Sequence, residues 1–350
     1  MLRQIARLAR PVPGAGDRAL AIAVYAGADN QPVRAREAGY EGVACVDDAA
    51  RALELYCDLW EATRLAWTKQ WCEGLLDFLL AMQGADGRWT NFILDWDGTP
   101  NREGRTSVAG GGFWQARALL ALARSSRVLA DPRIKPAVLS GMAYVTTCRD
   151  VPSDVRSLHV LAALSMLGRS DESALLELID RWCTEIVDCH HGHTLMNSQA
   201  ERGQPHLWGH VQEGALAEAG SRLGRDDLVA TACRSVDRVF ADVIKRGFDM
   251  RRVQPYDVAS AVYVLATVAT VTDRADYLAL AATARGWFDG DNPSGQRVYD
   301  RRAGRVADGI DGTVLSSNSG AESNIVGAQA LFDDATRLAR SLSVASALPA

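Results

Sequence analysis

The chain has 350 residues, of which 48% are hydrophobic and 23% charged, a composition typical of a globular protein with one large core or two domains. A formal net charge of −5 with scattered arginines excludes the basic face that nucleic-acid binding needs, so we expect no nucleic-acid partner. No stretch approaches 18 continuous apolar residues, so no membrane span is expected. Seven cysteines without a Cys-x-x-Cys pair favour reduced thiols and a cytoplasmic location.

Hydrophobic periodicity close to 3.6 residues runs through most of the chain and predicts an all-α fold. Helices are expected at about 15–27, 45–64, 66–83, 112–129, 132–148, 153–168, 171–188, 207–223, 226–246, 255–272, 274–289 and 320–341. We expect a single domain over 15–341, preceded by an N-terminal extension over 1–14 and followed by a C-terminal tail over 342–350.

Two kinds of helix alternate along the chain. One kind is rich in Ala, Ser and Leu, and the other carries charge on one face. A helix with little polar surface is buried on all sides, whereas an amphipathic helix covers a core from outside. The alternation recurs every 40–65 residues or so and predicts an (α/α)6 toroid, in which six helical hairpins form an inner and an outer ring.

The long loops are all expected on one face of this toroid. They connect an outer helix to the next inner helix, at about 28–44, 84–111, 189–206 and 290–319. Loops well beyond a dozen residues in a compact fold are usually functional. The sequence therefore predicts a cleft at the N-terminal ends of the inner helices.

Carboxylates mark the starts of several inner helices. Asp47 and Asp48 stand side by side where the helix over 45–64 begins, a place where the helix dipole favours an acid. For any one of these acids, helix capping or an ion pair is the simpler interpretation. Because several converge on one rim, we take them as candidate catalytic residues: Asp48, Glu213, Asp47, Asp257 and Glu322.

Three stretches of sequence carry a resemblance to known proteins. They are 46–53 (VDDAARAL), 83–92 (QGADGRWTNF) and the block from Asn292 to Asn324. With them, the chain resembles the (α/α)6-barrel, six-hairpin glycosidase-like proteins, in particular the glycosidase-like domain found beside glycosyltransferases. The resemblance implies that fold and a carbohydrate-active enzyme. The chain departs from the group at 106–115 (TSVAGGGFWQ), where the group has an acidic Ser-Glu-Asp-Ser-His-Gly stretch, so the group's polar residues are not carried over as a whole.

Glycoside hydrolysis with inversion needs two carboxyl groups about 6.5–9.5 Å apart, one as acid and one to activate water. We favour Asp48 and Glu213, because the neighbouring Trp208 would desolvate Glu213 and suit it to the role of acid. The expected substrate is an oligosaccharide or glycoconjugate, and no cofactor is expected.

Aromatic and polar residues near the predicted cleft are candidates for sugar binding. Flat aromatic rings stack on sugar rings, although a place in the core is the commoner role of an aromatic residue. The candidates are Trp89, Asn91, Asp95, Trp96, Trp114, Arg156, Trp208, His210, Tyr256, Asn318 and Asn324.

Three other functions stay open. A polysaccharide lyase would use Tyr256 or His210 as base. A non-catalytic carbohydrate-binding or scaffold protein needs none of these roles. A terpenoid-cyclase-like toroid is suggested by one Gln83-x-x-x-Gly87-x-Trp89 motif, but the acidic motif of those enzymes is missing. The histidine spacings match no zinc signature, so no metal site is expected.

Overall fold

The structure, a computed structural model, describes residues 1–29, 31–33, 41–168, 172–201 and 203–342. The chain consists of two compact units. Unit 1 comprises Met1–Cys148, Tyr299–Asp308 and Ser316–Ala350, and unit 2 comprises Arg149–Val298 and Gly309–Leu315. The single domain expected over 15–341 stays a prediction.

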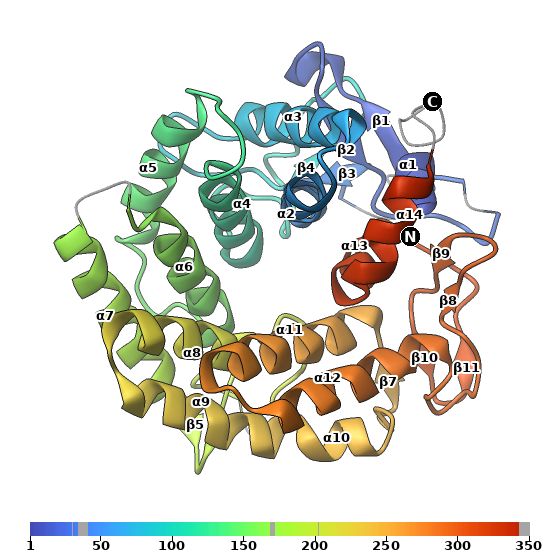
Figure 1. Cartoon of the computed structure of the whole chain (residues 1–350). Helices are drawn as coiled ribbons and strands as arrows, with labels where there is room; N and C mark the ends of the chain where they lie inside the picture. The colour runs from blue at the N-terminus through green and yellow to red at the C-terminus, as the bar shows by residue number, and fades with distance from the viewer. Residues whose placement is uncertain (30, 34–40, 169–171, 202, 343–350) are drawn as a thin grey trace. The chain divides into compact units, whose positions relative to one another are not determined.

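In its described residues, unit 1 contains three helical hairpins (Figure 1). They are α2 (Val46–Thr63) with α3 (Ala66–Ala81), α4 (Gly112–Ser125) with α5 (Ile134–Val145), and α13 (Ala321–Ala330) with α14 (Phe332–Ser341). Helix α2 packs against both α4 and α13, so the first helices of the three hairpins are neighbours. A short helix, α1 (Leu2–Leu8), packs on α13.

Unit 2 repeats this arrangement with three more hairpins in its described part. They are α6 (Ser153–Met166) with α7 (Glu172–Asp188), α8 (Gln212–Leu223) with α9 (Asp226–Val239), and α11 (Pro255–Thr272) with α12 (Ala275–Gly286). Helix α8 contacts both α6 and α11. Two of these hairpins are followed by a short helical segment: α10 (Ala241–Lys245) follows α9, and the 3-10 turn η2 (Trp287–Asp289) follows α12.

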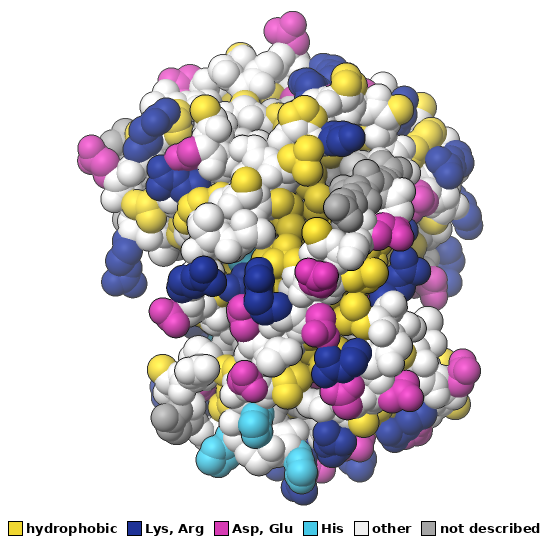
Figure 2. All heavy atoms as spheres, turned by 90° about the vertical axis from the view of Figure 1, so that its left-hand side faces the viewer, with side chains coloured by type: hydrophobic (Ala, Val, Ile, Leu, Met, Phe, Trp, Pro, Cys, Tyr) yellow, Lys and Arg dark blue, Asp and Glu magenta, His cyan; other side chains and the backbone are white. Residues whose placement is uncertain are grey.

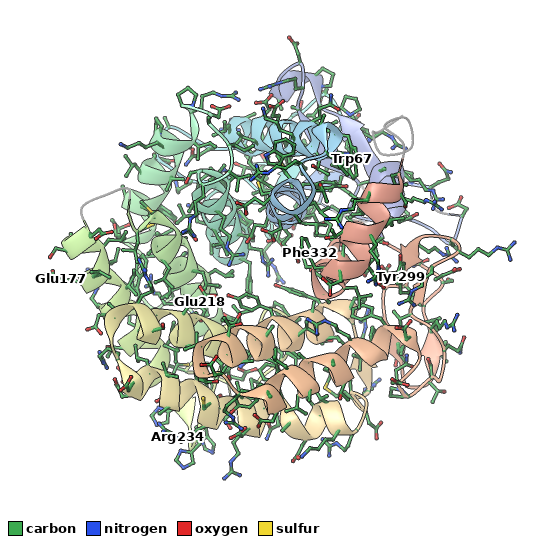
Figure 3. All side chains as sticks on the ribbon, in the orientation of Figure 1. Trp67, Glu177, Glu218, Arg234, Tyr299 and Phe332 are labelled. Carbon is green, nitrogen blue, oxygen red and sulfur yellow. The ribbon has the colours of Figure 1, made fainter. Side chains whose placement is uncertain are left out.

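These hairpins confirm the predicted all-α, (α/α)6 fold class. The first helix of a hairpin is more buried than the second, as its small-residue composition predicted. Helix α6 buries 13 of its 14 residues, whereas its partner α7 buries five of 17. In the α2–α3 hairpin the Tyr56 ring lies edge-on to Trp67, with 6.2 Å between the ring centroids, and stacks on Trp71. Trp67 is labelled in Figure 3.

The helix predicted over 15–27 is wrong. The segment forms the 3-10 turn η1 (Pro13–Ala15) and strand β2 (Leu20–Ile22), which pairs antiparallel with β1 (Ala9–Pro11). A short apolar run is equally compatible with a buried strand, which is why periodicity misassigned it. Strand β2 packs on α3, where a Cβ added at Gly74 would lie only 2.8 Å from Leu20 Cδ1.

Both ends of unit 1 also differ from prediction. Residues 1–14 contain α1, whose Leu2, Ile5 and Leu8 are buried, rather than only an extension. The helix predicted over 320–341 breaks at Leu331, where φ is −106° and ψ 47°, and so supplies both helices of its hairpin.

Short strand pairs hold the long connections against the helix starts. In unit 1 they are β3 (Ala44–Cys45) with β4 (Phe92–Ile93) and β8 (Tyr299–Asp300) with β9 (Arg305–Val306). In unit 2 they are β5 (His190–His191) with β6 (Thr194–Leu195), and β10 (Ile310–Asp311) between β7 (Arg252–Val253) and β11 (Val314–Leu315). Among the described residues, no helix has the length and apolar character needed to cross a membrane.

Candidate active site

The start of α2 is held by the long loop that follows α3. The β3–β4 pairing brings the loop to this helix end, and the Val46 N–H donates to the Asn91 carbonyl at 2.8 Å. The Asn91 side chain accepts from the Asp47 N–H at 3.2 Å, and Cys45 Sγ accepts from the Asp48 N–H at 3.4 Å. The first-turn N–H groups are therefore satisfied by neighbours, and both aspartate side chains stay available for other partners.

Two arginines surround this pair of aspartates. Arg51, one turn along α2, lies 2.5 Å from Asp47 Oδ2 and 3.2 Å from Asp48 Oδ1. Arg117, from α4, donates to both carboxylate oxygens of Asp47, and its guanidinium lies 4.5 Å from the centroid of the Phe113 ring. Asp47 thus has two cationic partners, whereas Asp48 shares one of them.

The pKa values of the two neighbouring aspartates are driven apart. Burial raises the pKa of Asp48 to about 7, aided by the negative charges of Glu322 and Asp47 and only partly opposed by Arg51. Burial also acts to raise the pKa of Asp47, but Arg117 and Arg51 outweigh it and hold that pKa below its usual value. Near pH 7 Asp47 is therefore ionised, whereas Asp48 is close to its titration midpoint and still holds a proton in about half of the molecules.

Glu322 is the third acid of the cluster and the most exposed. It stands in the first turn of α13, which begins where Asp308 Oδ1 accepts from the Gly320 N–H at 2.7 Å. Its Oε1 lies 2.8 Å from Arg51 Nη1, and its side chain is 41% exposed, against 4% for Asp48. Because Asp48 Oδ1 and Glu322 Oε1 contact the same nitrogen, they lie closer together than about 6.5 Å, the lower limit for inverting glycosidases.

Glu213 lies in unit 2 and is fully buried at the start of α8. Its Oε1 accepts from the Ser235 hydroxyl at 2.5 Å and lies 3.0 Å from His210 Nε2. Its Oε2 has no hydrogen-bonding partner among the described residues. Trp208, which was predicted to desolvate Glu213, is itself 38% exposed, and that desolvating role stays a prediction.

The hydrogen bonds around His210 fix its protons. Asn197 Nδ2 donates to the His206 carbonyl at 2.9 Å, so Asn197 Oδ1 is the atom that accepts from His210 Nδ1 at 2.6 Å. With Nδ1 protonated, the contact of Nε2 with Glu213 Oε1 requires a second proton between those two atoms. The buried His210–Glu213 pair therefore carries no net charge, which suits its complete burial.

Trp208 is the most exposed of the predicted sugar platforms. One face of its ring stacks on His206, with 3.9 Å between centroids and 6° between planes. His206 Nε2 lies 3.6 Å from Asp154 Oδ2, and burial lowers the pKa of His206. The stacked rings form a flat surface in unit 2, and the Asp154 carboxylate lies beside His206.

Other residues predicted to bind sugar in unit 1 have hydrogen-bonding partners within the protein. Trp89 is fully buried, and its indole N–H donates to the Leu79 carbonyl at 2.9 Å, so it is a core residue and not a platform. Trp114 is half-buried, and its indole N–H donates to the Trp89 carbonyl at 3.1 Å. Asp95 is exposed and accepts from the N–H of the half-buried Trp96 at 2.7 Å. Asn91 is buried beneath Asp47.

The remaining candidates are also mostly structural. Asp257 Oδ2 accepts from the Gln254 N–H at 2.7 Å as part of a capping box on α11, next to the half-buried Tyr256. Arg156 is buried, lies 2.7 Å from Glu185 Oε2, and lies over a tryptophan ring of α7.

Two asparagines complete the predicted set. Asn324 is fully buried and accepts from the Val306 N–H at 2.9 Å. Asn318 is exposed, and its carbonyl accepts from the Asp308 N–H at 3.0 Å.

Sequence reasoning missed the residues that set the charge of these sites. Arg117 stands in the middle of the largely apolar helix α4, and an arginine at such a position is a signal for a buried ion pair. Asn197 and Ser235, which hold the His210–Glu213 pair, carried no such signal, because short polar residues are common in loops and on helix surfaces.

The exposed histidines form no metal centre. Histidine side chains gather on the face drawn in Figure 2, and His190, His191 and His193 of the β5–β6 hairpin are exposed. Within the described ranges, no group of three or more His, Cys, Asp or Glu side chains is placed to hold a metal ion.

Comparison with known proteins supports the fold. No family model and no curated protein sequence matches the chain.

Among solved structures, a sugar epimerase from a ruminal bacterium matches with a TM-score of 0.67 and 11% identity, over 92% of this chain and 93% of the other. Cellobiose 2-epimerase from Spirochaeta thermophila DSM 6192 matches with a TM-score of 0.64 and 13% identity, over 90% of this chain and 91% of the other. A glycosyl hydrolase of family 88 from Bacteroides vulgatus matches with a TM-score of 0.59 and 11% identity, over 82% and 91%. The chain thus has the (α/α)6, six-hairpin glycosidase-like fold that the sequence predicted.

Proposed function

We propose that this protein is a carbohydrate-active enzyme that hydrolyses a glycosidic bond at the cluster of Asp47, Asp48 and Glu322. The observation that carries the proposal is the opposite displacement of the pKa values of Asp47 and Asp48. Neighbouring titratable groups with pKa values pushed apart are the arrangement that acid–base catalysis requires. The fold alone would not support this assignment, because one fold hosts many reactions.

In this proposal Asp48 is the general acid and Glu322 the nucleophile. Glu322 attacks the anomeric carbon while the Asp48 proton passes to the leaving oxygen, so the glycosidic C–O bond breaks as a glycosyl ester forms. The Asp48 carboxylate then takes a proton from water, which attacks the anomeric carbon and releases Glu322. Asp47 is a positioning residue, since it holds Arg51, which contacts the other two acids.

The short separation of Asp48 and Glu322 supports a retaining mechanism rather than the inverting one expected from the sequence. Both carboxyl groups contact Arg51 Nη1, which brings them nearer than an intervening water would require. The pairing of Asp48 with Glu213 stays a prediction, since the two acids belong to different units.

The substrate we propose is an oligosaccharide or glycoconjugate. Trp208 in unit 2 stays a predicted sugar platform. We also propose that the protein works in the cytoplasm. All seven cysteines are free, which suits a reducing compartment.

The test is a screen of glycans for hydrolysis, with Asp48→Asn and Glu322→Gln beside the wild type. Each substitution should lower kcat at least about 100-fold, the usual contribution of a positioned acid or nucleophile. Asp58→Asn is the matched control, because Asp58 is an exposed aspartate on the same helix outside the cluster. Full activity of both variants on an identified substrate would refute the proposal. For an active glycan, NMR of the first-formed product should show retention, and inversion would exclude Glu322 as nucleophile.

A sugar epimerase or isomerase is the second candidate. Two of the solved structures with a similar fold are sugar epimerases. In addition, a protonated carboxyl group beside an ionised one can move a proton at a sugar carbon. Reaction in D2O separates the two functions, because an epimerase or isomerase places deuterium on a sugar carbon, whereas a hydrolase incorporates the oxygen of H2(18O) into its product. Unsaturated products would instead indicate a lyase, and binding without turnover a non-catalytic protein.

A further inference from the structure

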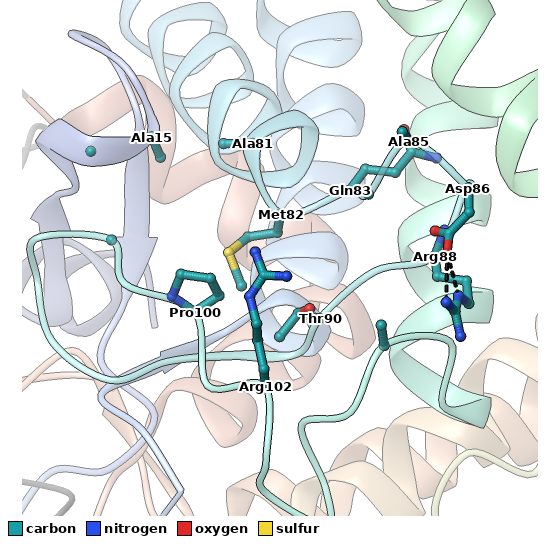
Figure 4. A pocket seen from close by; sticks show the side chains of 14 residues that line it. Ala15, Ala81, Met82, Gln83, Ala85, Asp86, Arg88, Thr90, Pro100 and Arg102 are labelled. Carbon is teal, nitrogen blue, oxygen red and sulfur yellow. Dashed lines mark hydrogen bonds and ion pairs between the residues drawn. The ribbon is translucent and has the colours of Figure 1, made fainter.

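A pocket lies in unit 1 whose lining contains no residue of the acid cluster. It has a volume of about 530 Å³ and lies between the end of α3, the turn η1 and the long loop that follows α3 (Figure 4). It is lined by Gly14, Ala15, Ala81, Met82, Gln83, Gly84, Ala85, Asp86, Arg88, Thr90, Gly98, Pro100, Arg102 and Ala109. None of the acids and arginines of the Asp47–Asp48–Glu322 cluster belongs to this lining, so the pocket is a separate site.

The walls of the pocket are fixed by hydrogen bonds and close packing. The Gly84 N–H donates to the Arg88 carbonyl at 2.7 Å, and Gln83 Nε2 donates to the Ala137 carbonyl at 2.9 Å. On the other side, Gly14 meets the loop so closely that an added Cβ would lie 2.0 Å from the Asp97 carbonyl oxygen. A cavity with walls held in this way is largely formed before a ligand arrives.

The charges that line the pocket leave one cation unpaired. Arg88 and Asp86 neutralise each other, with Arg88 Nη2 2.6 Å from Asp86 Oδ2. Arg102, on the loop, has no ion-pair or hydrogen-bonding partner in the described part of the chain. Figure 4 shows the Arg102 side chain extending from the loop at the pocket. Met82 and Thr90 also line the pocket. The lining therefore has a net charge of +1, carried by a guanidinium with its donors unused.

This charge limits the ligand to a single negative charge. The pocket includes the C-terminal end of α3, which is the negative end of the helix dipole. A phosphate dianion would have one of its charges unbalanced there, whereas a carboxylate matches Arg102 in both charge and bidentate geometry. The carbonyls at the helix end and the Thr90 hydroxyl are suited to bind ligand hydroxyl groups.

We propose that this pocket binds a sugar acid, a sugar-sized ligand with one carboxylate and several hydroxyl groups. The site goes beyond the proposed function, since it contains none of the proposed catalytic residues. Arg102 would bind the carboxylate, and the end of α3 with Thr90 would bind the hydroxyl groups. The volume lies within the range of small-molecule sites in proteins.

Titration calorimetry of the full chain with D-glucuronate and D-galacturonate tests this inference. At least one of the two should bind, and glucose and glucose 6-phosphate should each bind at least about tenfold more weakly, as expected for loss of one charge-assisted contact or for an unbalanced charge. Arg102→Ala should weaken uronate binding at least about tenfold. Arg105→Ala is the matched control, because Arg105 is an exposed arginine of the same loop outside the pocket, and it should leave binding unchanged.

Asp48→Asn separates this inference from the proposed function, because it should abolish catalysis and leave uronate binding intact. The inference is overturned if neither uronate binds the wild type, if Arg102→Ala binds as tightly as the wild type, or if glucose 6-phosphate binds more tightly than both uronates. If Asp48→Asn weakens uronate binding as much as Arg102→Ala does, the uronate binds at the acid cluster and the separate pocket is refuted.

Discussion

Replacing Asp48 with asparagine should stabilise the protein more at high pH than at low pH. Asp48 is buried, with a side chain only 4% exposed, and burial raises its pKa from 3.8 to about 7. In the unfolded chain the group therefore loses its proton near pH 4, but in the folded protein only near pH 7. Between these values the folded state binds more protons, so the free energy of unfolding falls as pH rises through this window.

The size of this effect follows from the shift. Each pKa unit corresponds to about 1.4 kcal/mol, so the raised pKa of Asp48 lowers the free energy of unfolding by on the order of 4 kcal/mol above pH 7, by about 2 kcal/mol at pH 5 and by almost nothing below pH 4. Asparagine has no proton to lose and avoids the cost, while Arg51 keeps Asp47 and Glu322 as partners. The stability difference between Asp48→Asn and wild type should therefore grow by about 2 kcal/mol between pH 5 and pH 8.

Urea unfolding of both proteins at pH 5 and pH 8 measures this difference. The control is Asp47→Asn, at the neighbouring position. Because the pKa of Asp47 is lowered in the folded protein, its ionised form adds stability above the unfolded pKa, and this stability is lost only as pH falls through the folded pKa. Asp47→Asn should destabilise at both pH values, with no growth toward pH 8. A difference for Asp48→Asn that is the same at both pH values would refute the reasoning.

Three further predictions follow from the geometry of single residues. Glu322→Gln should lower kcat at least about 100-fold and leave the melting temperature unchanged, because the side chain is 41% exposed; a melting temperature that drops with activity would mean a structural role. Trp208→Ala should weaken oligosaccharide binding up to about tenfold in titration calorimetry, as expected for loss of an exposed stacking surface in unit 2; unchanged binding would mean that Trp208 is not a sugar platform. Trp89→Ala should lower the free energy of unfolding by about 3–5 kcal/mol, measured in urea, since it empties a buried position; a small loss with a raised KM would return Trp89 to the sugar site.

The helices with the strongest local signals could be predicted from the sequence. Helix α11 spans Pro255–Thr272, the range expected, because a proline suits the first helical turn and a long apolar run follows it. Helix α2 was expected to begin at the paired aspartates and does so. The alternation of small-residue and amphipathic helices then led to the (α/α)6 class, since burial on all sides and on one side are properties of composition.

Features that depend on contacts between distant segments could not be predicted in this way. The run over 15–27 is a strand and a turn because β1 pairs with it, a partner that local periodicity does not reveal. Trp89 and Trp208 both stand near turns in polar surroundings, but the indole of Trp89 reaches the Leu79 carbonyl in the core. Arg117 acquires its role only because α4 packs on α2 and brings it to Asp47.

The two adjacent aspartates show why charge, and not exposure, assigns their roles. Successive residues on a helix point about 100° apart, so the sequence predicted that at most one of them faces the substrate, and favoured Asp48. Asp47 is in fact the more exposed, at 19% of its side chain against 4%. Its two arginines, however, keep it ionised and bound, and a carboxylate held in this way neither donates a proton nor moves to attack carbon. Asp48 has less countercharge than its burial demands, and this deficit keeps a proton on it up to neutral pH. An acid that is poorly compensated in the folded protein is destabilising, as expected for a group placed for proton transfer at some cost in stability.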